Sequence, residues 1–128
     1  MAQYVPDVTQ ADVERIVGRD YPPELHAAIR ELIRGIEVRE KTRVVLACLK
    51  NAQGDAEKLA GELAEAAGYY REIIGEAEYP NYMRKAFRID RLSAEERERI
   101  IEKDKTQYLR WLRKGEGATG PAPESAAD

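Results

Sequence analysis

The sequence has few of the residues that most often carry out catalysis or bind metals. Its 128 residues include one cysteine, Cys48, and one histidine, His26. A single cysteine excludes an internal disulfide, and a single histidine excludes every metal site that needs two. Serine occurs only at Ser93, where it fits a helix cap, and at Ser125 near the C-terminus, so no serine–histidine arrangement is indicated. We therefore expect no cofactor and no metal.

Long apolar segments are also missing. No stretch approaches the roughly 20 apolar residues that a membrane span requires, and the first ten residues lack the basic and apolar parts of a secretory signal. Residues 44–49 are apolar throughout, which favours buried packing for Cys48 over a reactive thiol. We expect a soluble, cytoplasmic protein without a membrane partner.

The charges that are present divide unevenly along the chain. Charged residues make up 35% of the sequence, and the net charge is −3. Residues 1–83 hold ten basic and fifteen acidic side chains, residues 84–114 hold eleven and six, and the last fourteen residues hold three acids, which gives −5, +5 and −3. This pattern predicts an acidic body followed by a basic helical region.

Short sequence patterns predict where the helices begin. Thr9 with Asp12 and Ser93 with Glu96 have the spacing of capping boxes, in which two side chains satisfy the free N–H groups of the first turn. Asp55, directly after a glycine, is a further N-cap. The expected helices are 10–17, 23–36, 37–52, 55–78, 82–87 and 94–113.

The segment 56–77 is the clearest of these helices. Its apolar residues recur at alternating spacings of three and four, and further apolar positions widen the stripe, which indicates packing on a globular core. We predict an all-α fold, an irregular bundle of four to five helices built on a central antiparallel hairpin of 37–52 and 55–78. Residues 1–114 are expected to form a single helical domain, and 115–128, rich in Gly, Pro, Ala and acids, a disordered tail.

A row of glycines lies inside the long helix. Gly61, Gly68 and Gly75 recur every seven residues on the side opposite the apolar stripe. Each interior glycine lowers helix stability by about 1 kcal/mol relative to alanine. A row of small residues admits the close approach of another backbone, from this chain or from a partner. The alternative is a compositional bias without a function.

Tyrosine outnumbers phenylalanine by seven to one. Tyr69, Tyr79 and Tyr82 are grouped around the end of the long helix. Tyrosine suits a recognition surface, and it equally suits amphipathic packing under the end of a bundle. With the three glycines, these tyrosines form the candidate interaction surface.

Residues 84–114 contain basic residues interleaved with aromatic ones, a pattern that is typical of nucleic-acid binding. The acids Glu95, Glu96 and Glu98 oppose this interpretation, because they occupy the first turn of the expected last helix, where phosphates would require positive charge. The candidate basic surface consists of Arg84, Lys85, Arg88, Arg91, Arg110 and Arg113.

Carboxylate pairs leave an enzyme as a third alternative. Glu37 with Glu40, and Glu62 with Glu65, are one helical turn apart, but such pairs on a charged face are usually only solvated. By elimination we expect a non-enzymatic protein that acts through a protein partner or self-association. Nucleic-acid binding through 84–114 is the first alternative, and a small carboxylate enzyme is the second.

Overall fold

The computed structural model describes residues 5–115, and this part of the chain is helical with no strand. The predicted all-α class is therefore confirmed. The predicted tail 115–128 lies outside the described residues, apart from Gly115. The elements in chain order are α1 (Gln10–Asp20), α2 (Pro23–Gly35), α3 (Lys41–Ala52), α4 (Ala56–Glu78), α5 (Pro80–Arg84), the 3-10 helix η1 (Ala86–Arg91) and α6 (Ala94–Arg113).

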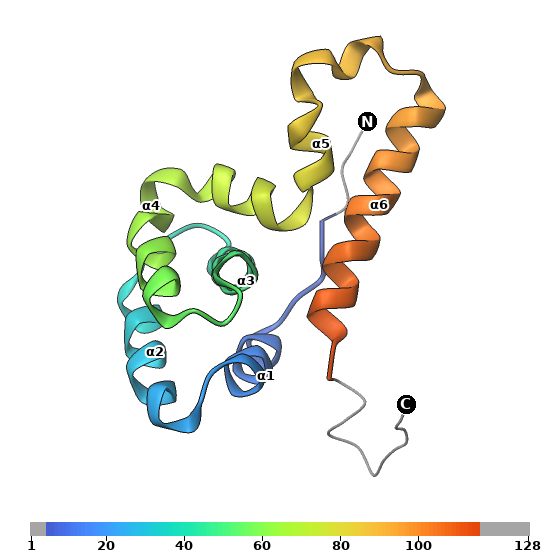
Figure 1. Cartoon of the computed structure of the whole chain (residues 1–128). Helices are drawn as coiled ribbons and strands as arrows, with labels where there is room; N and C mark the ends of the chain where they lie inside the picture. Colours follow the sequence, from blue (N-terminus) through green and yellow to red (C-terminus); the bar gives the residue numbers. More distant parts are fainter. Residues whose placement is uncertain (1–4, 116–128) are drawn as a thin grey trace.

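The core is built around α3. Figure 1 looks down the axis of α3 and shows α1, α2 and α4 arranged around it. All six residues from Val44 to Leu49 are buried, so the helix is contacted on every side. Burying all faces explains why this segment is apolar throughout instead of showing the one-sided stripe of a surface helix.

Helix α4 is bent. Its backbone leaves the helical region at Tyr69 (φ −128°, ψ 29°), and its two halves pass around α3 in different directions (Figure 1). Helix α3 also begins at Lys41, because Glu40 adopts a left-handed conformation (φ 51°). The antiparallel hairpin predicted from 37–52 and 55–78 is therefore not confirmed in that form, although α3 and α4 do pack against each other across a tight turn.

Three helices begin at the N-caps predicted from the sequence, whereas some helices end at other residues than predicted. Both capping boxes are present, and Asp55 Oδ1 accepts a hydrogen bond from Lys58 N at 3.0 Å. Helix α1 continues past Gly18 to Asp20 instead of stopping at residue 17. The helix predicted over 82–87 is instead two short elements, α5 and η1.

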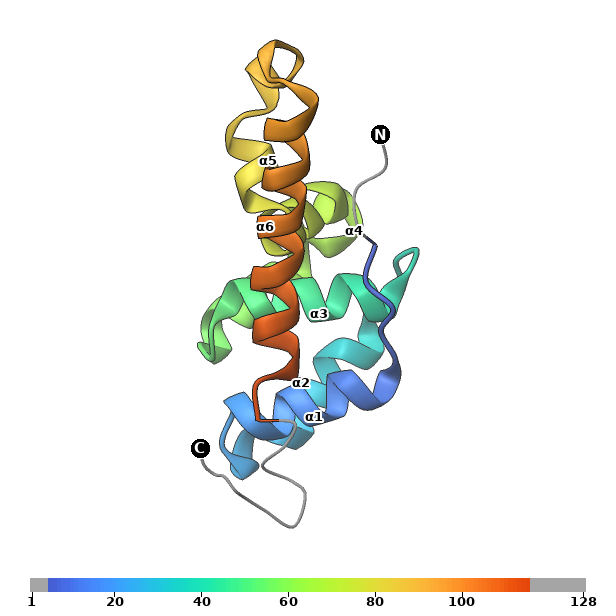
Figure 2. The same ribbon diagram turned by 90° about the vertical axis from the view of Figure 1, so that its right-hand side faces the viewer.

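An arm projects from this helical body. It consists of α5, η1 and the first half of α6. Its base, α5, packs against the end of α4, and its tip extends beyond α1–α4 in both views (Figures 1 and 2). None of the residues from 79 to 103 is fully buried. The second half of α6 returns along the body, where Tyr108 and Leu112 join the core. We define residues 80–103 as the arm and residues 5–79 with 104–115 as the body.

Candidate functional site

The arm is attached to the body by a buried carboxylate. Asp104 on α6 is 2% exposed and accepts hydrogen bonds from Asn81 N (2.9 Å), Asn81 Nδ2 (2.8 Å) and Tyr82 N (3.0 Å). Helix α5 has no side-chain cap from its own N-cap residue, Tyr79. Asp104 therefore caps α5 from another helix, with its negative charge at the positive end of the helix dipole.

A second α6 side chain holds the preceding helix end. Gln107 Nε2 donates to Ala77 O at 3.1 Å and to Asp104 O of its own helix at 3.0 Å. Asp104 and Gln107 lie one turn apart on the same side of α6 and bind the start of α5 and the end of α4. The junction between α4 and α5 is therefore fixed to α6, and the arm leaves the body in a defined direction.

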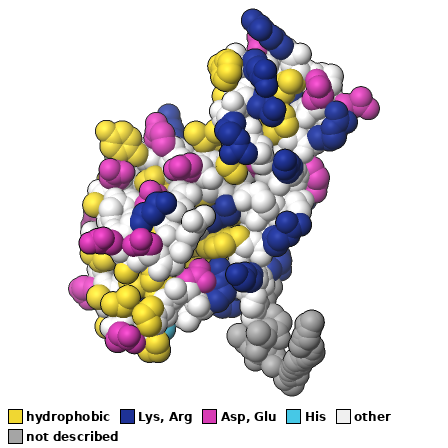
Figure 3. All heavy atoms as spheres, in the orientation of Figure 1, with side chains coloured by type: hydrophobic (Ala, Val, Ile, Leu, Met, Phe, Trp, Pro, Cys, Tyr) yellow, Lys and Arg dark blue, Asp and Glu magenta, His cyan; other side chains and the backbone are white. Residues whose placement is uncertain are grey.

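The arm exposes an aromatic ring among basic side chains. Phe87 on η1 is 85% exposed, and Met83 on α5 is 40% exposed. Basic side chains outnumber acidic ones on the face of the arm that Figure 3 shows, whereas acids are numerous on the body. Four members of the candidate basic surface belong to this arm, namely Arg84, Lys85, Arg88 and Arg91.

The other two members of that surface are far from the arm. Arg110 and Arg113 lie in the last turn of α6. A helix of 20 residues is about 30 Å long, so they lie at the opposite end of the molecule from η1. The structure therefore divides the candidate basic surface into two separate parts.

The three candidate tyrosines are also divided. Tyr79 and Tyr82 form an edge-to-face pair with ring centroids 6.3 Å apart. Burial and the neighbouring Glu78 carboxylate raise the pKa of the Tyr79 hydroxyl. Tyr69 lies at the bend of α4 and is 59% exposed, outside this pair.

The three glycines have different surroundings. Gly61 and Gly68 are exposed, and a Cβ atom at either position would meet nothing within 4 Å. Gly75 is buried, and Met83 Cε of α5 lies 3.2 Å from the position of an added Cβ. Among residues 5–115, only Gly75 of the three is covered by another helix in the way predicted for the whole row.

These surroundings predict opposite effects of two alanine substitutions. Gly61→Ala should raise the free energy of unfolding by about 1 kcal/mol, because it improves helix propensity in open space. Gly75→Ala should gain nothing or destabilise, because the added methyl must displace Met83. Urea denaturation of both variants measures the difference. A Gly61→Ala variant that is less stable and smaller in solution than the parent would show that a second copy covers this face.

The remaining candidate residues do not converge on a reactive centre. Burial raises the pKa of the Cys48 thiol to about 12, and the His26 Nε2 atom lies 2.7 Å from Tyr21 O. Glu37 and Glu65 are exposed, and they belong to the two carboxylate pairs considered above. Among residues 5–115, no three His, Cys, Asp or Glu side chains are grouped as metal ligands. No helix in that range is long and apolar enough to span a membrane.

Sequence reasoning did not single out two residues that shape this site. Asp104 lies four residues before Tyr108 and eight before Leu112, on the buried side of α6. An acid within an apolar stripe indicates a carboxylate with a specific buried partner, so this signal was available. The exposure of Phe87 had no such signal, because a lone phenylalanine between basic residues fits a core position equally well.

Comparison with known proteins gives no relative. No protein-family model, curated protein or solved structure matches the chain.

Proposed function

We propose that this protein is a non-enzymatic binding protein whose arm binds a protein partner. The observation that carries the proposal is Phe87, whose ring is 85% exposed on a segment that projects from the body. Leaving an aromatic ring in water is unfavourable, whereas burying it in an interface is stabilising. Aromatic and arginine side chains provide a large share of the binding energy in protein interfaces.

The charges of the arm indicate the chemistry of the partner. Arg88 directly follows Phe87 on η1, Arg91 ends the same helix, Arg84 ends α5, and Lys85 lies between the two helices. An apolar pocket with an acidic rim would complement this surface. A second copy of the chain is included among such partners, since residues 1–83 have a net charge of −5. The expected location, the cytoplasm, belongs to the same proposal.

The attachment of the arm supports a binding role. Asp104 holds the first turn of α5 through two backbone N–H groups, and Phe87 follows a few residues later. A surface that is held in place before binding loses less conformational entropy when the complex forms. The arm therefore presents Phe87 from a defined position.

Nucleic-acid binding through 84–114 is the second candidate, and the four basic residues around Phe87 favour it. Two features of the structure weigh against it. Glu95, Glu96 and Glu98 are exposed on the first turns of α6, within the same arm. Arg110 is at the far end of α6, and the exposed residues between it and η1 include the acid Glu102 beside Arg99 and Lys103, so negative charge is mixed into the surface that a phosphate backbone would contact.

The test replaces Phe87 by a photo-crosslinking amino acid in living cells and does the same at Leu32. Leu32 is the matched control, because it is an apolar residue 44% exposed on α2 of the body. A protein that is crosslinked from position 87 and not from position 32 supports the proposal. Crosslinks to nucleic acid alone would favour the second candidate and overturn the first.

Binding of the purified partner then gives the size of the effect. Phe87→Ala should raise the dissociation constant by about 30-fold or more, as expected for an interface residue that contributes about 2 kcal/mol to binding. Leu32→Ala should leave it unchanged. Both variants should unfold at the same urea concentration as the parent, because Phe87 contributes little to the core. Unchanged affinity of Phe87→Ala for the partner would contradict the proposal. The mass of the parent protein in solution shows whether the partner is a second copy of the chain.

A further inference from the structure

A cavity of about 470 Å³ lies where the ends of three helices meet. Arg19 and Asp20 come from the end of α1, Lys50 and Gln53 from the end of α3, and Trp111 with Lys114 from the end of α6. The cavity is within the size range of pockets for small molecules. It belongs to the body and is separate from the exposed surface around Phe87.

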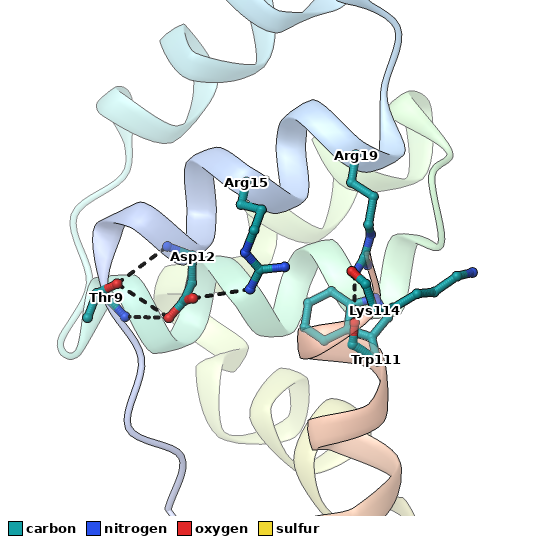
Figure 4. A network of polar contacts seen from close by, with 6 residues as sticks. All are labelled: Thr9, Asp12, Arg15, Arg19, Trp111 and Lys114. Carbon is teal, nitrogen blue, oxygen red and sulfur yellow. Dashed lines mark hydrogen bonds and ion pairs between the residues drawn. The ribbon is translucent and has the colours of Figure 1, made fainter. Parts of the chain in front are cut away.

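One wall of the cavity is the guanidinium group of Arg19, which uses four of its five N–H donors in hydrogen bonds. Arg19 Nη1 donates to Trp111 O at 2.7 Å and to Lys114 O at 2.8 Å, as Figure 4 shows. Its Nε and Nη2 atoms donate to the Asp20 carboxylate at 2.7 and 3.0 Å, and its Cζ lies 5.4 Å from the Trp111 ring centroid. Arg19 therefore neutralises Asp20 and caps the end of α6.

Lys50 is different, because its ammonium group has no such partner. The side chain is half-buried, and among residues 5–115 it makes no hydrogen bond or ion pair. Burial lowers the pKa of its ammonium group, and the Asp104 carboxylate opposes that shift from a distance. The Asp104 oxygens are already occupied by three donors on Asn81 and Tyr82. A half-buried charge without a partner is costly.

The end of α3 accounts for only part of this charge, because Lys50 lies in its last turn, where the helix dipole favours a cation, but makes no direct hydrogen bond there. Cations often lie at helix C-termini because they bind the last free carbonyls. The last turn of α3 is closed by its own backbone instead: Gln53 N donates to Leu49 O at 3.3 Å, and Asp55 N donates to Ala52 O at 3.0 Å. Arg19 performs this role for α6. Lys50, in contrast, makes no hydrogen bond to the carbonyls of α3 within residues 5–115.

We propose that this cavity binds a small oxyanion, a phosphate or a carboxylate compound, with Lys50 as its counter-ion. The charged groups that line the cavity, Arg19, Asp20, Lys50 and Lys114, have a net charge of +2. An anion beside Lys50 supplies the missing opposite charge, and charge-assisted hydrogen bonds are the strong ones in such a setting. The Trp111 ring offers an apolar wall for the remainder of a larger ligand.

The test is a titration of the full chain with inorganic phosphate and with succinate, followed by NMR of the backbone amides and the Trp111 indole N–H. Sodium chloride at equal ionic strength separates a bound anion from simple screening. We expect saturable shifts at Gly54 and Trp111, which line the cavity. The anion that saturates the site at the lower concentration shows whether the cavity prefers a phosphate or a carboxylate.

The variant Lys50→Met removes the charge and keeps an unbranched side chain that is shorter by one atom. It should weaken the binding of the preferred anion by at least tenfold. Lys58→Met is the matched control, because Lys58 is exposed on α4 outside the cavity. The affinity of this variant for the anion should equal that of the parent. Shifts scattered over the parent's surface, no saturation with either anion, or equal affinity of Lys50→Met would overturn the proposal. The first two outcomes need no variant, so the test stands even if Lys50→Met fails to fold.

Discussion

Arg43→Met should lower the free energy of unfolding by about 3–5 kcal/mol, as expected when one partner of a buried ion pair is removed. Arg43 Nε and Nη2 donate to the two carboxylate oxygens of Glu78, each at 2.7 Å, so the contact is bidentate. Glu78 is 4% exposed. The variant leaves this carboxylate in the core without its partner, while the Glu40 contact of Arg43 is lost only at the surface.

The loss should depend on pH in a defined direction. In the parent, burial raises the pKa of the Glu78 carboxyl and Arg43 opposes that shift. In Arg43→Met only burial remains, so the folded-state pKa rises further above the unfolded value. A carboxyl with a raised folded-state pKa stabilises the fold below its unfolded pKa and loses that contribution as pH rises through the folded pKa. The gap between variant and parent should therefore widen from pH 4 to pH 7 in urea denaturation.

Two further variants identify the cause. Arg39→Met removes an exposed arginine from the connection before α3 and should change stability by less than about 0.5 kcal/mol. The double variant Arg43→Met with Glu78→Met replaces the ion pair by apolar side chains and should recover most of the loss. If the double variant is as unstable as Arg43→Met, the ion pair is not the reason.

The parts of the fold that local signals determine were predictable from the sequence. The side chains of Thr9, Asp55 and Ser93 cap helices where their spacing to the next residues predicted it. These caps depend on a few neighbouring residues and on the free N–H groups of one turn. The central position of residues 44–49 was predictable for a related reason, because an all-apolar segment must be covered on every side.

Features that depend on distant contacts were not predictable in this way. The bend at Tyr69 has no proline beside it, and the periodicity of α4 continues through it. Glu40 adopts a left-handed conformation that its residue type does not favour, so the start of α3 was placed four residues too early. Neither conformation is indicated by the spacing or the type of the neighbouring residues, and α4 has glycines at 61 and 75 as well without a bend.

The candidate site shows the same division. The excess of basic residues in 84–114 is visible in the sequence, but the separation of Arg110 and Arg113 from the four candidate residues of the arm follows from the length of α6. That length was predicted, so the separation could have been derived. The sequence could not show which glycines of the row are covered, because Gly61 and Gly75 occupy equivalent positions of the seven-residue repeat but have different neighbours in the fold.

Asp104→Ala should lower the free energy of unfolding by about 2–4 kcal/mol, because donors in a partly buried junction lose their acceptor. The backbone N–H groups of Asn81 and Tyr82 and the Asn81 amide are affected. Removing this carboxylate also separates the arm from the body, whose core lies around α3. Hydrogen exchange should therefore accelerate over 80–91 much more than over 44–49.

Asp90→Ala provides the matched control, since Asp90 is an exposed acid on η1 within the same arm. It should change neither stability nor the exchange pattern. Asp104→Ala should in addition weaken binding of the partner. Asp104 does not contact the partner, but without it Phe87 would no longer be held in position before binding. Uniform acceleration over the body and the arm would contradict the role of Asp104 as the attachment of the arm. Normal exchange in 80–91 would show that the contacts of Gln107 with the end of α4 are enough to hold it.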